Sequence, residues 1–111
     1  SLGVKGPNEC MVEKVRPLLK KYNVNAYFCG DEHAMQHFSE PVLNRSLEYL
    51  VSGCTNFIND NDPNRGKVDK DYVKYFWKTG QNQTNNCEDC LGAIVYIETS
   101  NDHMDCTYFN T

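Results

Sequence analysis

The chain has 111 residues, and its 11 Lys and Arg against 15 Asp and Glu give it a formal net charge of −4. Its length predicts a single domain, residues 1–111, and its acidic balance argues against nucleic acid or an anionic membrane surface as a partner. No apolar run approaches the roughly 20 residues that cross a bilayer, so we expect a soluble chain without membrane insertion.

Cysteine is unusually frequent for so short a chain, with six residues. Disulfides persist in oxidising compartments, and two N-glycosylation sequons begin at Asn44 and Asn82. We therefore expect a secreted, extracellular glycoprotein with disulfide bonds. The CxxC spacing of Cys87 and Cys90 leaves a redox or metal role open, but the polar surroundings favour a structural disulfide. The sequence does not decide the pairing of Cys10, Cys29, Cys54, Cys87, Cys90 and Cys106.

Residues 8–23 predict an amphipathic helix. Apolar residues recur at helical spacing on one stripe, Asn8 can cap the start, and Lys20 and Lys21 suit the C-terminal end of the helix dipole. Pro17 lies on the polar side and predicts a kink or the start of a second segment. The stripe consists of Met11, Val12, Val15, Leu18, Leu19 and Tyr22.

Residues 24–29 are almost continuously apolar, a pattern typical of a strand buried on both faces of a parallel sheet. A helix followed by such a strand looks like the second half of a βαβ unit. Further apolar or alternating runs of strand length follow, and the last two should form a hairpin around residues 100–102. The runs cover residues 34–38, 46–53, 71–78, 91–100 and 103–110.

Residues 59–71 form one strongly polar segment, NDNDPNRGKVDKD, whose acids suggest calcium. Asp60, Asp62, Asn64 and Asp71 fit the ligand positions of an EF-hand-like loop. However, Arg65 stands where such a loop needs Gly, and the same residue types are common in ordinary turns. A solvated loop is therefore the main interpretation, with calcium binding as the alternative.

The stretch GPNECMVEKVRPLLKKYNVNAYFCGDEHAMQHF, together with LVSGCTNFI and LGAIVYIETSNDHMDCTYFN, resembles the C-terminal part of a tartrate-resistant purple acid phosphatase. These enzymes are members of the metallophosphoesterase superfamily. The resemblance covers nearly the whole chain but only about the last third of such an enzyme. It implies an α+β fold with an N-terminal helix and one mixed, largely antiparallel sheet, like the C-terminal half of a metallophosphoesterase sandwich.

The resemblance also implies a chemistry, the hydrolysis of phosphate monoesters at a dinuclear iron or iron–zinc centre. Most of the family's metal ligands belong to N-terminal motifs that this sequence does not contain. In the part that is present, Lys5 takes the place of a histidine ligand, and the family's Gly-His-x-His becomes Gly-Asp-Glu-His at residues 30–33. We expect His33 and Asp31 to be vestigial metal ligands, and His37 and His103 to be ordinary polar residues on strands.

A single sheet from a two-sheet sandwich should expose apolar side chains, and large exposed apolar patches mark interfaces. We therefore expect a protein partner, either a second copy in a homodimer or a complementary chain that covers the sheet. The side chains expected on this exposed face include Tyr27, Val51, Ile94 and Tyr96.

Three functions follow from these observations. The first is a secreted, non-catalytic derivative of the phosphatase fold, a pseudoenzyme without cofactors or catalytic residues that acts by binding, by signalling or as a structural component. The alternative is one chain of a two-chain acid phosphatase whose metal centre a partner completes. The third is a calcium-dependent extracellular protein that uses the acidic loop.

Overall fold

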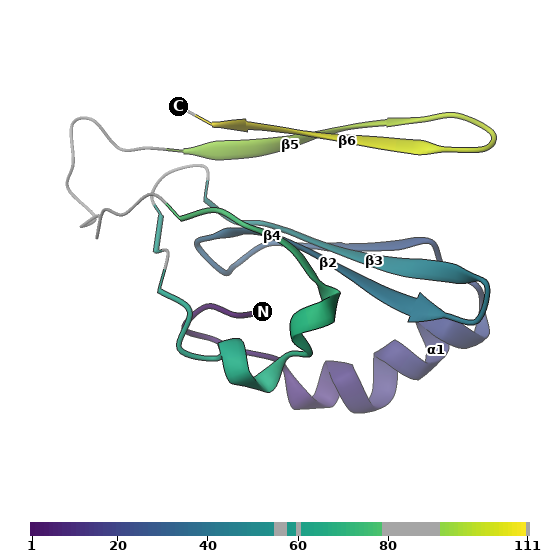
Figure 1. Cartoon of the computed structure of the whole chain (residues 1–111), viewed down its shortest axis with the longest axis horizontal. Coiled ribbons are helices and arrows are strands. Elements are labelled where there is room, and N and C mark those ends of the chain that lie inside the picture. Colours follow the sequence, from purple (N-terminus) through teal and green to yellow (C-terminus); the bar gives the residue numbers. More distant parts are fainter. Residues whose placement is uncertain (55–57, 60, 79–91, 111) are drawn as a thin grey trace.

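The protein is a layered α+β structure, described by a computed structural model for residues 1–54, 58–59, 61–78 and 92–110 (Figure 1). A helix lies along one face of a four-stranded sheet, and a two-stranded hairpin lies along the other face. The predicted α+β class, with one helix and a largely antiparallel sheet, is confirmed. The described ranges contain no helix with the length and apolar character needed to span a membrane.

The predicted helix has two parts. A π-helical turn, Met11–Val15 (η1), leads into α1, Arg16–Lys21. Asn8 caps the start as expected, since its Oδ1 accepts a hydrogen bond from the Met11 backbone N–H at 3.1 Å. Pro17 lies in the first turn of α1, directly after the π-turn. The predicted second segment is α1, which begins one residue before Pro17.

The helix buries none of its side chains in η1 or α1. Leu18 is 51% exposed and Tyr22 is 68% exposed. The predicted stripe is therefore divided, with Met11, Val15 and Leu19 half-buried and Val12, Leu18 and Tyr22 exposed. The residues that do face the sheet are only half-buried.

The main sheet has the strand order β1-β3-β2-β4. Its strands are β1 (Ala26–Cys29), β2 (Met35–Val42), β3 (Arg45–Ser52) and β4 (Val73–Phe76). Two short 3₁₀ turns, η2 (Arg65–Lys67) and η3 (Lys70–Tyr72), lie between β3 and β4. β1 runs parallel to β3, as the apolar run predicted, and all other pairs are antiparallel. β1 is an edge strand rather than a fully buried one, since Phe28 is 47% exposed.

Two tight connections shape the β-structure. The predicted hairpin exists as β5 (Ala93–Thr99) and β6 (Met104–Asn110), but these strands form their own two-stranded sheet. A second hairpin, β2–β3, was not predicted, because its turn contains no Gly. Leu43 adopts a φ of 56° there and is fully exposed. The left-handed conformation is uncommon for such a side chain, so the sequence gives little sign of it.

Alternation along β2 divides the core between the two faces of the main sheet. On the hairpin side, Met35 packs with Cys54, Ile58 and Ala93. On the helix side, Leu2, Phe38 and Val51 form the second cluster. Val51 is only 4% exposed, so the prediction that it lies on an open face is wrong. The hairpin and the N-terminal segment already cover much of the sheet.

Candidate functional site

The GDEH segment follows directly after β1, at the carboxyl end of the parallel strand. Polar loops at this end of parallel strands commonly form ligand sites in α/β proteins. Asp31 adopts a φ of 68° and points its carboxylate to the surface. Its Oδ2 lies 2.5 Å from Lys5 Nζ, and the Lys5 hydrogen bond lowers the pKa of Asp31. The two positions that the resemblance matches to histidine ligands therefore form an exposed ion pair here.

Glu32 has a different role, because only 5% of it is exposed. Its Oε2 accepts hydrogen bonds from Ser1 Oγ at 2.8 Å and from the Lys5 backbone N–H at 3.1 Å. A Cβ added at Gly3 would lie 2.3 Å from Glu32 Oε1, so the glycine is what allows the carboxylate to approach. Glu32 thus fixes the N-terminal segment against the loop.

Gln36, on β2, completes this polar cluster and is fully buried. Its side-chain carbonyl accepts from the Leu2 backbone N–H at 2.8 Å, and its amide donates to Ser1 Oγ at 3.2 Å. The four side chains Lys5, Asp31, Glu32 and Gln36 therefore hold residues 1–5 across the end of the sheet. Glu32 and Gln36 make these contacts with the Ser1 hydroxyl and with backbone N–H groups, whereas Lys5 pairs with Asp31.

The predicted metal residues do not form a ligand set by themselves. His33 is half-buried, and its carbonyl accepts a hydrogen bond from the Asn59 N–H at 2.7 Å. Within the described ranges, no three His, Cys, Asp or Glu side chains are grouped so that they could hold a metal ion. The Lys5 ammonium lies beside Asp31, and Glu32 accepts a hydrogen bond from backbone. These residues therefore do not fit the dinuclear centre that the resemblance implies.

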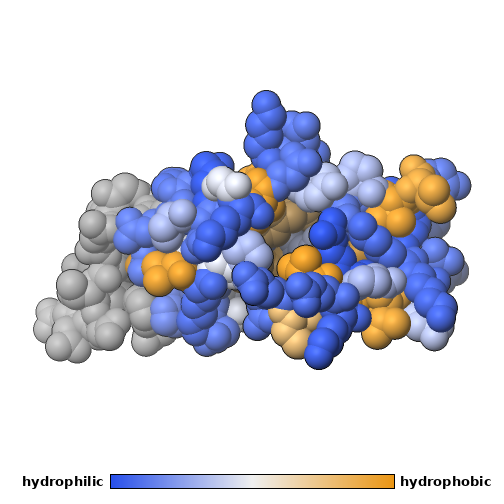
Figure 2. Space-filling model, turned by 90° about the horizontal axis from the view of Figure 1, so that it is seen from below, coloured by the Kyte–Doolittle hydropathy of each residue, from blue (hydrophilic) through white to orange (hydrophobic). Residues whose placement is uncertain are grey.

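A hollow of about 620 Å³ lies between the helix and the main sheet; we call it the helix-side hollow. Its walls are mainly apolar, and its rim includes Lys5, Asp31 and Glu32. Figure 2 views the molecule from this side and shows apolar patches among hydrophilic residues around a recess. The apolar wall residues are Met11, Val12, Val15, Leu19, Tyr27, Phe38, Val51, Val68 and Tyr72.

Glu40 lies in the wall of this hollow and was missed by sequence reasoning. It is 2% exposed, and its carboxylate accepts hydrogen bonds from Arg16 Nε at 2.9 Å, Arg16 Nη2 at 2.5 Å and Tyr49 OH at 2.8 Å, with Lys20 Nζ also in contact. Burial opposes ionisation, but the hydrogen bonds from Arg16, Lys20 and Tyr49 outweigh it and lower the pKa of Glu40 to about 2.

The Glu40 network is the principal connection between helix and sheet. Arg45 adds a second one, since it donates to the Val24 carbonyl at 2.8 Å and to the Lys20 carbonyl at 3.4 Å, where α1 ends. The sequence did contain a signal for the network. Arg16 and Lys20 are four residues apart and so share one side of the helix. Glu40 is two and four residues after Phe38 and Gln36, so it shares their face of β2.

His37 is a polar residue on β2, as expected, whereas His103 lies in the β5–β6 turn, before β6 begins. His37 Nε2 lies 2.7 Å from Glu48 Oε2, and Ser39 Oγ and Ser46 Oγ bind the other oxygen of the carboxylate at 2.8 and 2.5 Å. Burial opposes ionisation of Glu48, but these hydrogen bonds prevail and lower its pKa. Tyr108 lies beside this cluster, and burial raises its pKa to about 12.

Those predicted calcium ligands of the acidic loop that the structure describes make contacts with other protein groups. Asp62 binds Arg65 and lies 2.7 Å from Lys78 Nζ. Asn64 is buried and donates to the Gly3 carbonyl at 2.6 Å. Asp71 donates its backbone N–H to Asp69. Asp60, Asn82, Cys87 and Cys90 lie outside the described residues. Calcium binding therefore stays a prediction.

Asn44 is exposed in the β2–β3 turn. The four described cysteines are free thiols: Cys10 and Cys29 are exposed, Cys54 is buried and Cys106 is half-buried. Neither the glycan nor a disulfide is tested by these positions, and both stay predictions.

The sequence was compared with family models and with curated proteins. No family model matches the chain, but curated relatives cover 97% of it. The chain is homologous to the C-terminal part of the purple acid phosphatases. The particular relatives are tartrate-resistant acid phosphatase type 5 of Homo sapiens (33% identical), of Rattus norvegicus (32%) and of Sus scrofa (29%). The chain spans only 28–30% of the length of these relatives.

These relatives correct one expectation. The sequence led us to predict a non-enzyme, on the ground that most metal ligands are missing. That prediction is wrong as argued, because the relatives are named as acid phosphatases and the chain corresponds to less than a third of their length. Ligands that belong to other parts of such a protein give no evidence on its activity.

Proposed function

We propose that the chain is the C-terminal structural module of a purple-acid-phosphatase-type protein, and that it functions by receiving a complementary polypeptide segment in the helix-side hollow. The complementary segment belongs either to the same longer protein or to a separate chain. The observation that carries the proposal is a helix that buries no side chain above a mainly apolar hollow of about 620 Å³.

The physical reason lies in packing density. Apolar side chains that line an open hollow lack the dense packing of a protein interior, so a segment that fills the hollow would be stabilised by their burial. Half-buried apolar side chains on both walls, such as Val15 and Leu19 on the helix and Tyr27 on β1, gain burial when a segment enters. β1 also pairs only with β3 among the described strands, so its outer edge is open to a further strand.

Hydrolysis of phosphate esters, the activity in the relatives' name, is proposed only for the completed protein. Residues outside this segment would have to supply the metal ligands, since the Lys5–Asp31 ion pair and the buried Glu32 do not supply them. Secretion is part of the same proposal and is supported by the cysteine content, the two sequons and the exposed position of Asn44.

A dye that fluoresces on binding apolar surface, 1-anilinonaphthalene-8-sulfonate, tests whether the hollow accepts a ligand. The chain alone should bind the dye, and Val15→Asp, which places a charge in the hollow wall, should lower the dye affinity at least several-fold. Leu43→Asp is the control, since Leu43 is fully exposed, does not line the hollow and belongs to no other proposed surface. Equal dye binding by both variants, or none by the unmodified chain, would reject the proposal.

A further inference from the structure

The outer face of the β5–β6 hairpin is a graded surface of three cross-strand pairs, which we call the hairpin face. Ile94 lies opposite Phe109, Tyr96 opposite Thr107, and Glu98 opposite Asp105. Ile94, Tyr96 and Phe109 are each 51–53% exposed. The face is therefore apolar at the end near the start of β5 and acidic at the end near the turn.

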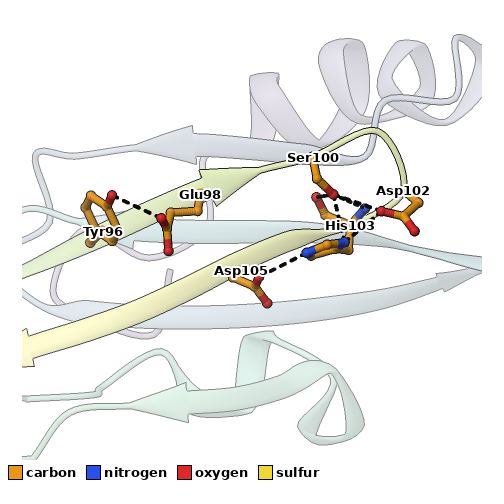
Figure 3. A network of polar contacts seen from close by, with 6 residues as sticks. All are labelled: Tyr96, Glu98, Ser100, Asp102, His103 and Asp105. Carbon is orange, nitrogen blue, oxygen red and sulfur yellow. Dashed lines mark hydrogen bonds and ion pairs between the residues drawn. The ribbon is translucent and has the colours of Figure 1, made fainter.

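The acidic end continues into the turn itself (Figure 3). His103 Nδ1 lies 2.7 Å from both Asp102 Oδ1 and Ser100 Oγ, and His103 Nε2 lies 3.3 Å from Asp105 Oδ2. Because Ser100 and Asp102 bind the same ring nitrogen, the group has no proton-relay geometry of the Ser-His-Asp kind. These contacts instead hold the carboxylates in place and leave them exposed to solvent.

A surface of matching chemistry lies on the helix. Lys14, Leu18, Lys21 and Tyr22 fall at i, i+4, i+7 and i+8, all are exposed, and none lines the helix-side hollow. We call this set the helix stripe. Lys21 Nζ lies 5.4 Å from the centroid of the Tyr22 ring, so the cation and the aromatic group are already held together.

The two surfaces match in length and in order. Glu98 is four positions after Ile94, a span of about 13 Å on a strand, and Tyr22 is eight positions after Lys14, about 12 Å on a helix. With Lys14 against the acidic pair, Leu18 meets the Tyr96 pair and Tyr22 meets the Ile94 pair.

We propose that the hairpin face of one copy of this chain docks on the helix stripe of a second copy. Apolar side chains supply the contact at one end, and the Glu98–Asp105 carboxylates facing Lys14 fix its direction at the other. The contact joins different surfaces of the two copies, so it is head-to-tail, and each bound copy leaves one surface of each kind open for the next. The inference is independent of the helix-side hollow.

Two double variants test this arrangement in the full chain by light scattering. The hairpin variant is Ile94→Ser with Phe109→Ser, and the helix variant is Leu18→Ser with Tyr22→Ser. The unmodified chain should rise above its 12.8 kDa monomer mass with concentration, whereas each variant alone should stay monomeric. An equimolar mixture should form a dimer of about twice that mass, because each variant retains the surface that the other lacks.

Several outcomes would overturn the proposal. They are a monomeric unmodified chain at every concentration, association of either variant alone, or a monomeric mixture. Circular dichroism checks that the variants fold. A milder pair of single variants, Tyr96→Ser for the hairpin face and Leu18→Ser for the helix stripe, repeats the test with less change to each chain. Raising the ionic strength from about 0.1 M to about 1 M shortens the screening length from about 10 to about 3 Å and should weaken the association.

Discussion

At the residue scale, glycines and single polar atoms decide how the loop after β1 is held. Gly53, at the end of β3, is the clearest case, because a Cβ there would lie 2.2 Å from the backbone oxygen of Glu32 and 3.1 Å from the backbone N of Asp31. Backbone atoms cannot rotate away as a flexible side chain can. The close approach of β3 to the GDEH segment therefore depends on the missing side chain.

Gly53→Ala should consequently destabilise the protein by about 1–3 kcal/mol, the usual cost of overpacking. Gly66→Ala is the control, because nothing lies within 4 Å of its added Cβ, and its effect should stay within about 0.5 kcal/mol. Urea denaturation of both variants measures the difference. Equal stability of the two would mean that the loop does not lie against Gly53.

Two tyrosines give a second prediction. The Tyr108 hydroxyl is the one buried side-chain polar atom in the described ranges without a hydrogen-bond partner, so Tyr108→Phe should be neutral or stabilise the fold by up to about 1 kcal/mol. Tyr49→Phe removes a 2.8 Å hydrogen bond to the Glu40 carboxylate and should cost about 1.5–3 kcal/mol. Thermal unfolding of both variants checks the contrast, and a destabilised Tyr108→Phe would contradict it.

At the element scale, polar contacts hold the helix to the sheet, since η1 and α1 bury no side chain. Glu40→Gln should therefore destabilise the helix more than the strands, by about 1–3 kcal/mol, because Arg16 and Lys20 lose their shared carboxylate. Asp31→Asn breaks an exposed ion pair and should leave the melting temperature unchanged. Far-ultraviolet circular dichroism follows the helix, and equal effects of both changes would refute the role of Glu40.

The same network predicts a pH dependence. The pKa of Glu40 is about 2 in the folded protein against an ordinary value of 4.5, so the folded state binds its proton less readily than the unfolded state. The contribution of Glu40 to stability is therefore complete above about pH 4.5 and is lost as the pH falls toward 2. The fall in melting temperature between pH 5 and about pH 2.5 should be smaller in Glu40→Gln; an identical fall would contradict the assignment.

The sequence predicted the elements better than their packing. Periodicity, the Asn8 cap and Pro17 placed the helix, and the turn at residues 100–102 placed the β5–β6 hairpin. It did not predict that Glu40 is buried, because this depends on Arg16, Lys20 and Tyr49 converging from two different elements. Likewise, the loop GDEH was recognised from its motif, but the contact between Lys5 and Asp31 depends on how the N-terminal segment crosses the sheet.

At the scale of the whole molecule, the two faces of the main sheet differ in how completely they are covered. On one face, the hairpin forms a core with Met35, Cys54 and Ile58, and these three are 0–1% exposed. On the other face, the helix stands over a hollow of about 620 Å³. The proposed function accounts for this asymmetry, because a complementary segment would cover the less filled face.

Hydrogen exchange of the isolated chain, followed amide by amide, tests this account most directly. If the helix needs a complementary segment, the amides of Met11–Val15 and Arg16–Lys21 should exchange through local opening, far faster than those at the centres of β2 and β3. Protection of the helix equal to that of the paired strands would show that the helix is already fully packed, and would contradict the proposed role of the hollow.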